Sequence, residues 1–332
     1  MQGRLEHEIK IDNYINEKLS GAPGFVSEWH MNLKASKKTA ATRKDFVCKI
    51  LNFLSKVNVT DISQFNLPMI ERYFISTQTK QDNNGNTVYT SDSYQQCVWI
   101  ALNNFFGFLY KRNYISENFM NNIDKPRNHD LERINEHRVL LTKKDFKRII
   151  NAVENGTGSD TAKAHQLNVK SRDKLIMSLL MSTGMRESAL TEINISDIDM
   201  ENKMLHIIDK GNKKHTYPLS DNIIDLINEW AARREIILDG ENSDALLITE
   251  GKKRLTQNGL AAIVKKYTMG ALGKALSPHK LRAGFCSILY AETGDAEFCR
   301  RAIGHSNIST TQRYITTGNN ERKRASEIMS FI

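Results

Sequence analysis

The sequence predicts an α+β fold that is mainly helical and divided between two domains. Apolar residues recur at helical spacing through the first part of the chain. The second part mixes such stretches with one strand–turn–strand segment. A chain of 332 residues is also long enough for about two domains, each with its own core.

Residues 25–122 are predicted to form an all-helical domain, with residues 1–24 as an extension ahead of it. The longest helix begins at Ser91 or Asp92, whose side chains can cap a helix N-terminus. Its apolar residues form one stripe at three- and four-residue spacing: Tyr94, Val98, Leu102, Phe105 and Leu109. Before this helix we expect a helix over residues 39–54, then a second helix that starts at Pro68, and then a turn cluster at residues 82–86.

Residues 123–140 are predicted to be a linker, because they combine a proline with many charges and little apolar periodicity. The second domain, residues 141–332, then begins with a helix that Thr142 can cap. A further helix, capped by Ser171, should end at Gly184, since glycine readily adopts the left-handed conformation at a helix end.

A β-hairpin is predicted where the segments 204–208 and 214–219 flank a short turn. Lys210 lies at its tip, and Pro218 indicates an edge strand or a strand end, because proline cannot donate to the ladder. Helices should complete the domain at the following places: 221–236, 256–268, 278–293, 295–303, a short segment around Tyr314, and 322–332.

Composition is ordinary for a globular protein, with 40% hydrophobic and 26% charged residues. No apolar run approaches the ~20 residues that a membrane span needs, and the N-terminus lacks the apolar core of a signal peptide. We therefore expect a cytoplasmic protein without a membrane partner. The cysteines form no CxxC pair and lie in apolar helical contexts, so we expect buried, reduced thiols and no metal site: Cys48, Cys97, Cys286 and Cys299.

The net charge of +9 is spread over both parts of the chain. Residues 1–130 hold 16 Lys and Arg against 13 Asp and Glu, a net charge of +3, and the remainder carries +6. A polyanion that contacts both domains fits this distribution.

The functional signal comes from six residues in four separated segments: Arg186, Lys210, His279, Arg282, His305 and Tyr314. Cleaving a phosphodiester without a metal requires an in-line nucleophile, cations that neutralise the non-bridging oxygens, and a proton for the leaving 5′-oxygen. A phenol can attack once cations or a base activate it, because its pKa is about 10. Arginine offers two parallel donors that match phosphate oxygens. Taken singly, each residue has a simpler explanation as a surface or core side chain.

Taken together, the segments 183–186, 210–213, 279–282 and 304–314 resemble the tyrosine recombinases, the phage-integrase family of site-specific DNA recombinases, and in particular the Xer type. The resemblance implies that the first domain is a SAM-like core-binding domain. It also implies that the second is a catalytic domain with a small antiparallel sheet. No cofactor and no metal are expected.

The resemblance also implies a role for each of the six residues. Tyr314 is then the nucleophile, and His279 accepts its proton. The other four act on the phosphate. Arg186 and Arg282 clamp it, His305 donates a hydrogen bond to it, and Lys210 acts at the leaving oxygen. Lys213 and Lys214 are close rivals of Lys210.

Two positions depart from the pattern of many family members. Many members carry a Glu three residues after the first Arg, where this chain has Ala189. Many also carry a His directly after the second Arg, where this chain has Ala283. Neither is a reacting group, so activity is still expected.

Two other functions remain open at this point. A type IB-like topoisomerase uses a similar residue set, although the spacing from His305 to Tyr314 favours the recombinase. A DNA-binding regulator could keep the fold without the chemistry, although the complete residue set argues against it.

The expected partner is double-stranded DNA with a specific recombination site, bound by a homotetramer. After Tyr314 a flexible connector leads to residues 321–332, whose apolar residues lie on one helical stripe: Ala325, Ile328, Met329 and Ile332. The resemblance suggests that this helix docks into a neighbouring protomer, and the alternative is that it folds back on its own domain.

Overall fold

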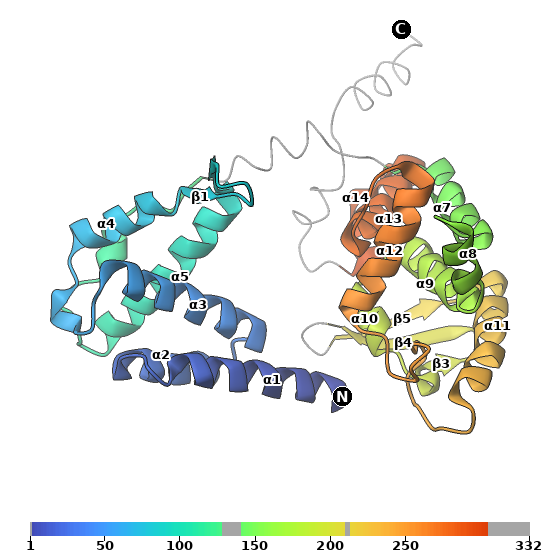
Figure 1. Ribbon diagram of the computed structural model, residues 1–332, viewed down its shortest axis with the longest axis horizontal. Coiled ribbons are helices and arrows are strands. Elements are labelled where there is room, and N and C mark those ends of the chain that lie inside the picture. The colour runs from blue at the N-terminus through green and yellow to red at the C-terminus, as the bar shows by residue number, and fades with distance from the viewer. Residues whose placement is uncertain (1, 128–140, 210–212, 305–332) are drawn as a thin grey trace, which may run out of the picture. The chain divides into compact units, whose positions relative to one another are not determined.

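The computed structural model describes residues 2–127, 141–209 and 213–304, and the chain divides into unit 1, Met1–His137, and unit 2, Arg138–Ile332 (Figure 1). Both units are dominated by helices, and the sheets are small and antiparallel. The predicted fold class, α+β and mainly helical, is confirmed.

Unit 1 is a helical domain with one short hairpin. Its elements are, in chain order, α1 (Gln2–Leu19), α2 (Gly24–Ala35), α3 (Ala40–Val57), η1 (Ile62–Gln64), α4 (Leu67–Ser76), β1 (Thr79–Gln81), β2 (Thr87–Tyr89), α5 (Asp92–Lys111) and η2 (Phe119–Asn122). Aromatic rings fill the core, where Phe106 meets Phe65 edge to face at 5.3 Å and Phe105 at 5.4 Å. Such pairs are stabilising beyond the area they bury.

The local start signals of unit 1 act as the sequence predicts. The Ser91 hydroxyl accepts a hydrogen bond from the Tyr94 N–H and caps α5. Four of the five predicted stripe residues of α5 are buried, whereas Tyr94 is exposed.

Two features of unit 1 add to the predicted helical domain. Residues 1–24, expected as an extension, contain α1, which packs on α3 and buries Ile11, Ile15 and Leu19 in the same core. Their four-residue spacing is the reason, because it forms one apolar stripe. One short hairpin accompanies the helices, since β1 and β2 pair on either side of the turn at 82–86.

The cysteine prediction is partly wrong. Cys286 and Cys299 are buried and Cys48 is half-buried, but Cys97 is exposed. On α5 it directly precedes the buried Val98, which turns it about 100° away from the core stripe.

Unit 2 packs helices around a three-stranded sheet. Its elements are α7 (Lys143–Asn155), α8 (Asp160–Leu167), α9 (Lys170–Thr183), α10 (Glu187–Glu192), η3 (Ile195–Asp197), β3 (Ile198–Asp199), β4 (Met204–Asp209), β5 (Lys213–Pro218), α11 (Asp221–Leu238), α12 (Gln257–Leu272), α13 (Pro278–Thr293) and α14 (Ala296–Ile303). Helix α9 lies at the centre of the core and packs on α7, α11 and α13.

The predicted hairpin is confirmed in the described part of the chain. Strands pair in the order β3-β4-β5, and the register of the last pair runs from Met204↔Pro218 to Asp209↔Lys213. Pro218 is both the last residue of its strand and on an edge strand, as expected. The tip, 210–212, is outside the described residues.

The predicted cap of α9 is wrong. The helix begins at Lys170, and its first hydrogen bond joins the Asp173 N–H to the Val169 carbonyl, so Ser171 is already inside it and buried. Helix α8 ends at Leu167 with Asn168 as its C-cap, so the N-cap position of α9 is Val169, whose side chain cannot accept a hydrogen bond.

One buried charge network links α9 to α12. The fully buried Asp173 accepts at Oδ1 from Arg172 Nε and Nη2, at 3.0 and 2.8 Å. At Oδ2 it accepts from Lys266 Nζ at 3.1 Å and the Tyr267 hydroxyl at 2.9 Å. Burial and the Asp173 carboxylate raise the pKa of Tyr267, so this phenol remains a neutral donor.

No helix within the described residues is both long and apolar enough to cross a membrane. The same residues hold no group of three or more His, Cys, Asp or Glu side chains that could bind a metal ion.

Candidate functional site

Arg186 lies at a sharp break between two helices. Helix α9 ends at Gly184, which has a φ of 60°, and Arg186 is then the N-cap residue of α10. A Cβ at Gly184 would lie 2.4 Å from Cδ1 of Phe285 on α13. Glycine is therefore required both by the left-handed backbone and by the packed ring. The break brings the half-buried Arg186 beside α13.

Arg282, on α13, is only 3% exposed, and its guanidinium binds two backbone carbonyls. Nη1 donates to the carbonyl of Gly184, and Nη2 donates to that of Ile303 at 3.0 Å. The first carbonyl is two residues before Arg186 and the second is two residues before His305. One buried side chain thus joins two of the four segments that carry the sequence signal, and it also binds the residue directly before a third.

His279 lies in the first turn of α13, where backbone N–H groups face outward and favour negative charge. Its side chain keeps solvent contact, but desolvation by the surrounding protein lowers its pKa, and the charges of Arg282, Lys280 and Arg186 lower it further. The imidazole is therefore neutral at neutral pH and able to accept a proton. The charges of two predicted residues, Arg186 and Arg282, thus act on the third, His279.

Sequence reasoning missed the contribution of Lys280. Its charge acts on His279 more strongly than that of Arg186. Lys280 directly follows His279 in the sequence, but a lysine at this place belongs to no recognisable motif.

Strand β5 of the predicted hairpin contacts the end of α14. Gly304 ends α14 with a φ of 74°, and a Cβ on it would lie 2.7 Å from Cε1 of His215 on β5. Lys210, His305 and Tyr314 themselves, and the segment 321–332, lie outside the described residues.

The two departures from the resemblance occupy packing positions. Ala189 is 5% exposed in the unit 2 core, and Ala283 packs against the small cluster of Cys286, Cys299 and Ile303. A longer polar side chain at the buried Ala189 would have to displace apolar neighbours.

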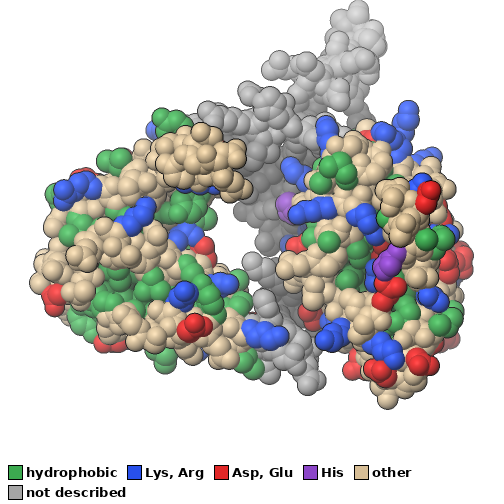
Figure 2. Space-filling view, viewed as in Figure 1, with side chains coloured by type: hydrophobic (Ala, Val, Ile, Leu, Met, Phe, Trp, Pro, Cys, Tyr) green, Lys and Arg blue, Asp and Glu red, His purple; other side chains and the backbone are tan. Residues whose placement is uncertain are grey.

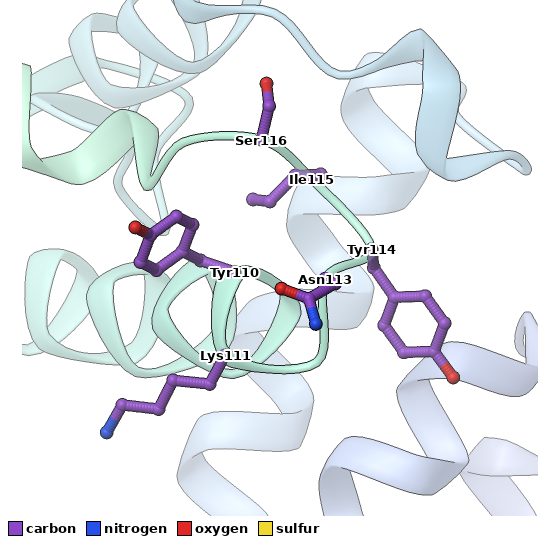
Figure 3. A pocket seen from close by; sticks show the side chains of 6 residues that line it. All are labelled: Tyr110, Lys111, Asn113, Tyr114, Ile115 and Ser116. Atoms are coloured by element: carbon purple, nitrogen blue, oxygen red, sulfur yellow. The ribbon is translucent and has the colours of Figure 1, made fainter.

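Basic side chains and one open hollow lie on the surface of the described residues. Figure 2 shows Lys and Arg side chains on the visible face of both units. An open hollow of about 520 Å³ lies in unit 1, at the end of α5, and contains none of the six predicted residues. Its lining side chains do not converge, since Tyr110 and Tyr114 point in different directions and the Tyr114 hydroxyl donates to Glu28 at 2.6 Å (Figure 3).

Comparison with known proteins places this arrangement in context. Residues 138–321 match the phage integrase family. Tyrosine recombinase XerC of Proteus mirabilis is 31% identical over 147 residues, 43% of this chain and 47% of that protein. Tyrosine recombinase XerD of Staphylococcus epidermidis is 32% identical over 145 residues, 43% and 49% of the two chains. The chain thus spans about half the length of the curated relatives it matches.

Solved structures share the fold over most of the chain. XerH site-specific recombinase bound to a palindromic difH substrate, in a post-cleavage complex, has a TM-score of 0.68 at 20% identity and covers 90% of this chain and 82% of its own. A lambda integrase tetramer bound to a Holliday junction has a TM-score of 0.62 at 14% identity, with 88% and 76% covered. At these identities the likeness establishes the fold of the chain.

Proposed function

Because this chain belongs to the phage integrase family, we propose that it is a site-specific DNA recombinase that cuts and rejoins strands through a 3′-phosphotyrosyl intermediate. The observation that carries the proposal is the buried Arg282, which binds the carbonyls of Gly184 and Ile303. These bonds bring the backbone before Arg186 and the end of α14 to the helix that carries His279, which supports a shared site. A single phosphate would be recognised at that site.

The reaction follows from the chemistry of the six residues. The Tyr314 phenol attacks the phosphorus as its proton passes to the neutral His279, and the bond to the 5′-oxygen breaks. Lys210 gives that oxygen its proton. Arg186 and Arg282 neutralise the non-bridging oxygens, and His305 donates a hydrogen bond to one of them. The phosphodiester energy is kept in the tyrosyl link, so neither ATP nor a metal is required.

Strand exchange completes the cycle. The 5′-hydroxyl of a second duplex attacks the phosphotyrosine and releases the phenol, which recovers its proton. We propose that four protomers carry out this exchange on paired sites, joined by the docking of residues 321–332. Integration, excision and resolution are all reactions of this type, and we propose that this protein acts in the cytoplasm.

Double-stranded DNA is the proposed substrate. The charges of +3 on residues 1–130 and +6 on the remainder suit binding through phosphates by both units. Binding should therefore weaken steeply as salt concentration rises, because bound phosphates release counterions.

The test uses the full-length protein and DNA from its own host element, with covalent adducts trapped in SDS and sequenced. Adducts at one recurrent sequence support a recombinase. Relaxation of any supercoiled plasmid without sequence preference indicates a topoisomerase instead. The absence of adducts on every DNA indicates a regulator that lacks the chemistry.

A further inference from the structure

We infer that His215 is a positioning residue, whose ring holds the Lys210 hairpin against the backbone that leads into His305. The inference rests on the proposed function, because it concerns two groups that would act on the same phosphate. His215 itself is not among the six residues of the site.

The contact involves the whole imidazole ring. A Cβ built on Gly304 would lie 2.7 Å from Cε1 of His215 and 3.3 Å from both Nδ1 and Nε2. The ring therefore occupies the space that any side chain at residue 304 would need. His215 is half-buried, and the ring of Tyr217, 9% exposed, lies on the same strand with its centroid 6.4 Å away.

The backbone at the end of α14 has two further contacts. Its N–H donates to the Arg301 carbonyl at 3.1 Å and closes α14, and the preceding Ile303 carbonyl accepts from Arg282. The end of α14 thus contacts both the buried guanidinium of Arg282, at Ile303, and the ring of His215, at Gly304.

The hairpin ladder connects the ring to the lysine. His215 pairs with Ile207, which is 6% exposed and belongs to the unit 2 core. From this pair the ladder continues through Ile208↔Lys214 to Asp209↔Lys213, next to the tip. A shift of the ring would be carried along this ladder to Lys210.

The chemistry explains why such a contact matters. Lys210 would serve the leaving oxygen and His305 a non-bridging oxygen of one phosphate, so their separation must be held to within about 0.5 Å. Lys210 and His305 are far apart in the sequence, so tertiary contacts must set this distance. The His215 ring supplies the fixed spacing.

The first experiment measures single-turnover cleavage of a suicide DNA substrate at saturating enzyme. His215→Ala should cleave about 10- to 100-fold more slowly, because a displacement near 1 Å has an effect of this size, while its DNA affinity and melting temperature stay close to those of the unaltered protein. His215→Phe should retain most of the rate, since its ring fills the same space. His206→Ala is the matched control, because His206 is an exposed histidine on β4 of the same hairpin, bonded to Thr216.

The second experiment tests the contact itself. Gly304→Ala should clash with His215 and slow cleavage, and adding His215→Ala should restore part of the lost rate by removing the clash. Gly273→Ala controls for backbone strain, because Gly273 has a φ of 67° at the end of α12 and nothing within 4 Å of a built Cβ. Losses that simply multiply in the double variant would contradict the contact.

The outcomes separate the two proposals. An unaltered protein that forms no adduct overturns both. Normal adducts, with His215→Ala cleaving at the unaltered rate, overturn this inference alone. A His215→Phe variant as slow as His215→Ala also overturns it, because a ring nitrogen would then be the active feature.

Discussion

Arg282 donates a hydrogen bond from Nη2 to the Ile303 carbonyl at 3.0 Å, and the acceptor is two residues ahead of His305. The same guanidinium donates to Gly184, two residues ahead of Arg186. Arg282 therefore has two tasks in the proposed site. It supplies positive charge, and it fixes the backbones from which two other site residues extend.

Removing only the hydroxyl of Tyr314 should abolish the covalent step. Tyr314→Phe is expected to bind DNA with unchanged affinity and to form no SDS-resistant adduct. Gel electrophoresis of trapped complexes measures this. An adduct at the normal level would show that another residue is the nucleophile.

Replacing Arg282 and Arg186 by lysine should have different effects. Both variants should lose about 10²- to 10³-fold in cleavage rate, because an ammonium cannot make the bidentate phosphate contact. Arg282→Lys should also lower the free energy of unfolding by about 1–3 kcal/mol, since it leaves a buried carbonyl without its donor. Arg186→Lys, at a half-buried cap position, should leave stability nearly unchanged. Calorimetry with cleavage assays checks both, and equal stabilities would contradict the positioning task of Arg282.

The pH–rate profile should report His279. Its pKa is lowered below the ordinary 6.5 by desolvation and by Arg282, Lys280 and Arg186. Cleavage needs the neutral base, so the rate should hold as pH falls through 6.5 and drop only at the lowered pKa. Lys280→Gln removes one of these charges and should move the acid limb to higher pH. An unmoved limb would mean that another group controls it.

The stability of unit 1 should depend on His30. This residue is 3% exposed, its Nε2 finds no hydrogen-bond partner in the described part of the chain, and burial lowers its pKa, with Lys34 and Arg43 adding to the effect. Because the unfolded chain binds the proton more readily, the stability that neutral His30 contributes is complete above pH 6.5. It is lost as pH falls from there through the lowered pKa. Chemical denaturation at several pH values should show a weaker acid dependence for His30→Leu, and an unchanged dependence would contradict it.

Deleting residues 321–332 tests the proposed docking. The truncated chain should bind a single site normally but fail to assemble four protomers on paired sites. Gel shift and light scattering distinguish the two states. Normal assembly would favour folding back on the same domain.

Predictions from the sequence were correct where the interactions involved join residues that are close together in the chain. Ser91 caps α5, and Pro218 ends an edge strand, because each acts through its own backbone. Ser171 misled because the hydrogen bonds of α9 start at Val169, directly after α8. The stripe of Ile11, Ile15 and Leu19 was visible, but its burial depends on α3, which is far away in sequence.

The sequence predicts the residue types of the candidate site but not their arrangement. The order and spacing of the segments pointed to Arg186, His279 and Arg282. The bond from Arg282 to Ile303 and the ring of His215 against Gly304 depend on tertiary packing, and a histidine on a strand carries no pattern that marks such a contact.

The hydrogen-bond network around Asp173 limits which substitutions this sequence can accept during evolution. One fully buried carboxylate accepts from Arg172, Lys266 and Tyr267, which lie on two helices far apart along the chain. Replacing Asp173 alone leaves the buried guanidinium of Arg172 without its carboxylate. Replacing a single donor leaves the buried carboxylate with fewer hydrogen bonds. In related chains these positions should therefore change together, with apolar residues replacing the group as a whole, and a mutational library that varies them independently should return mostly unfolded protein.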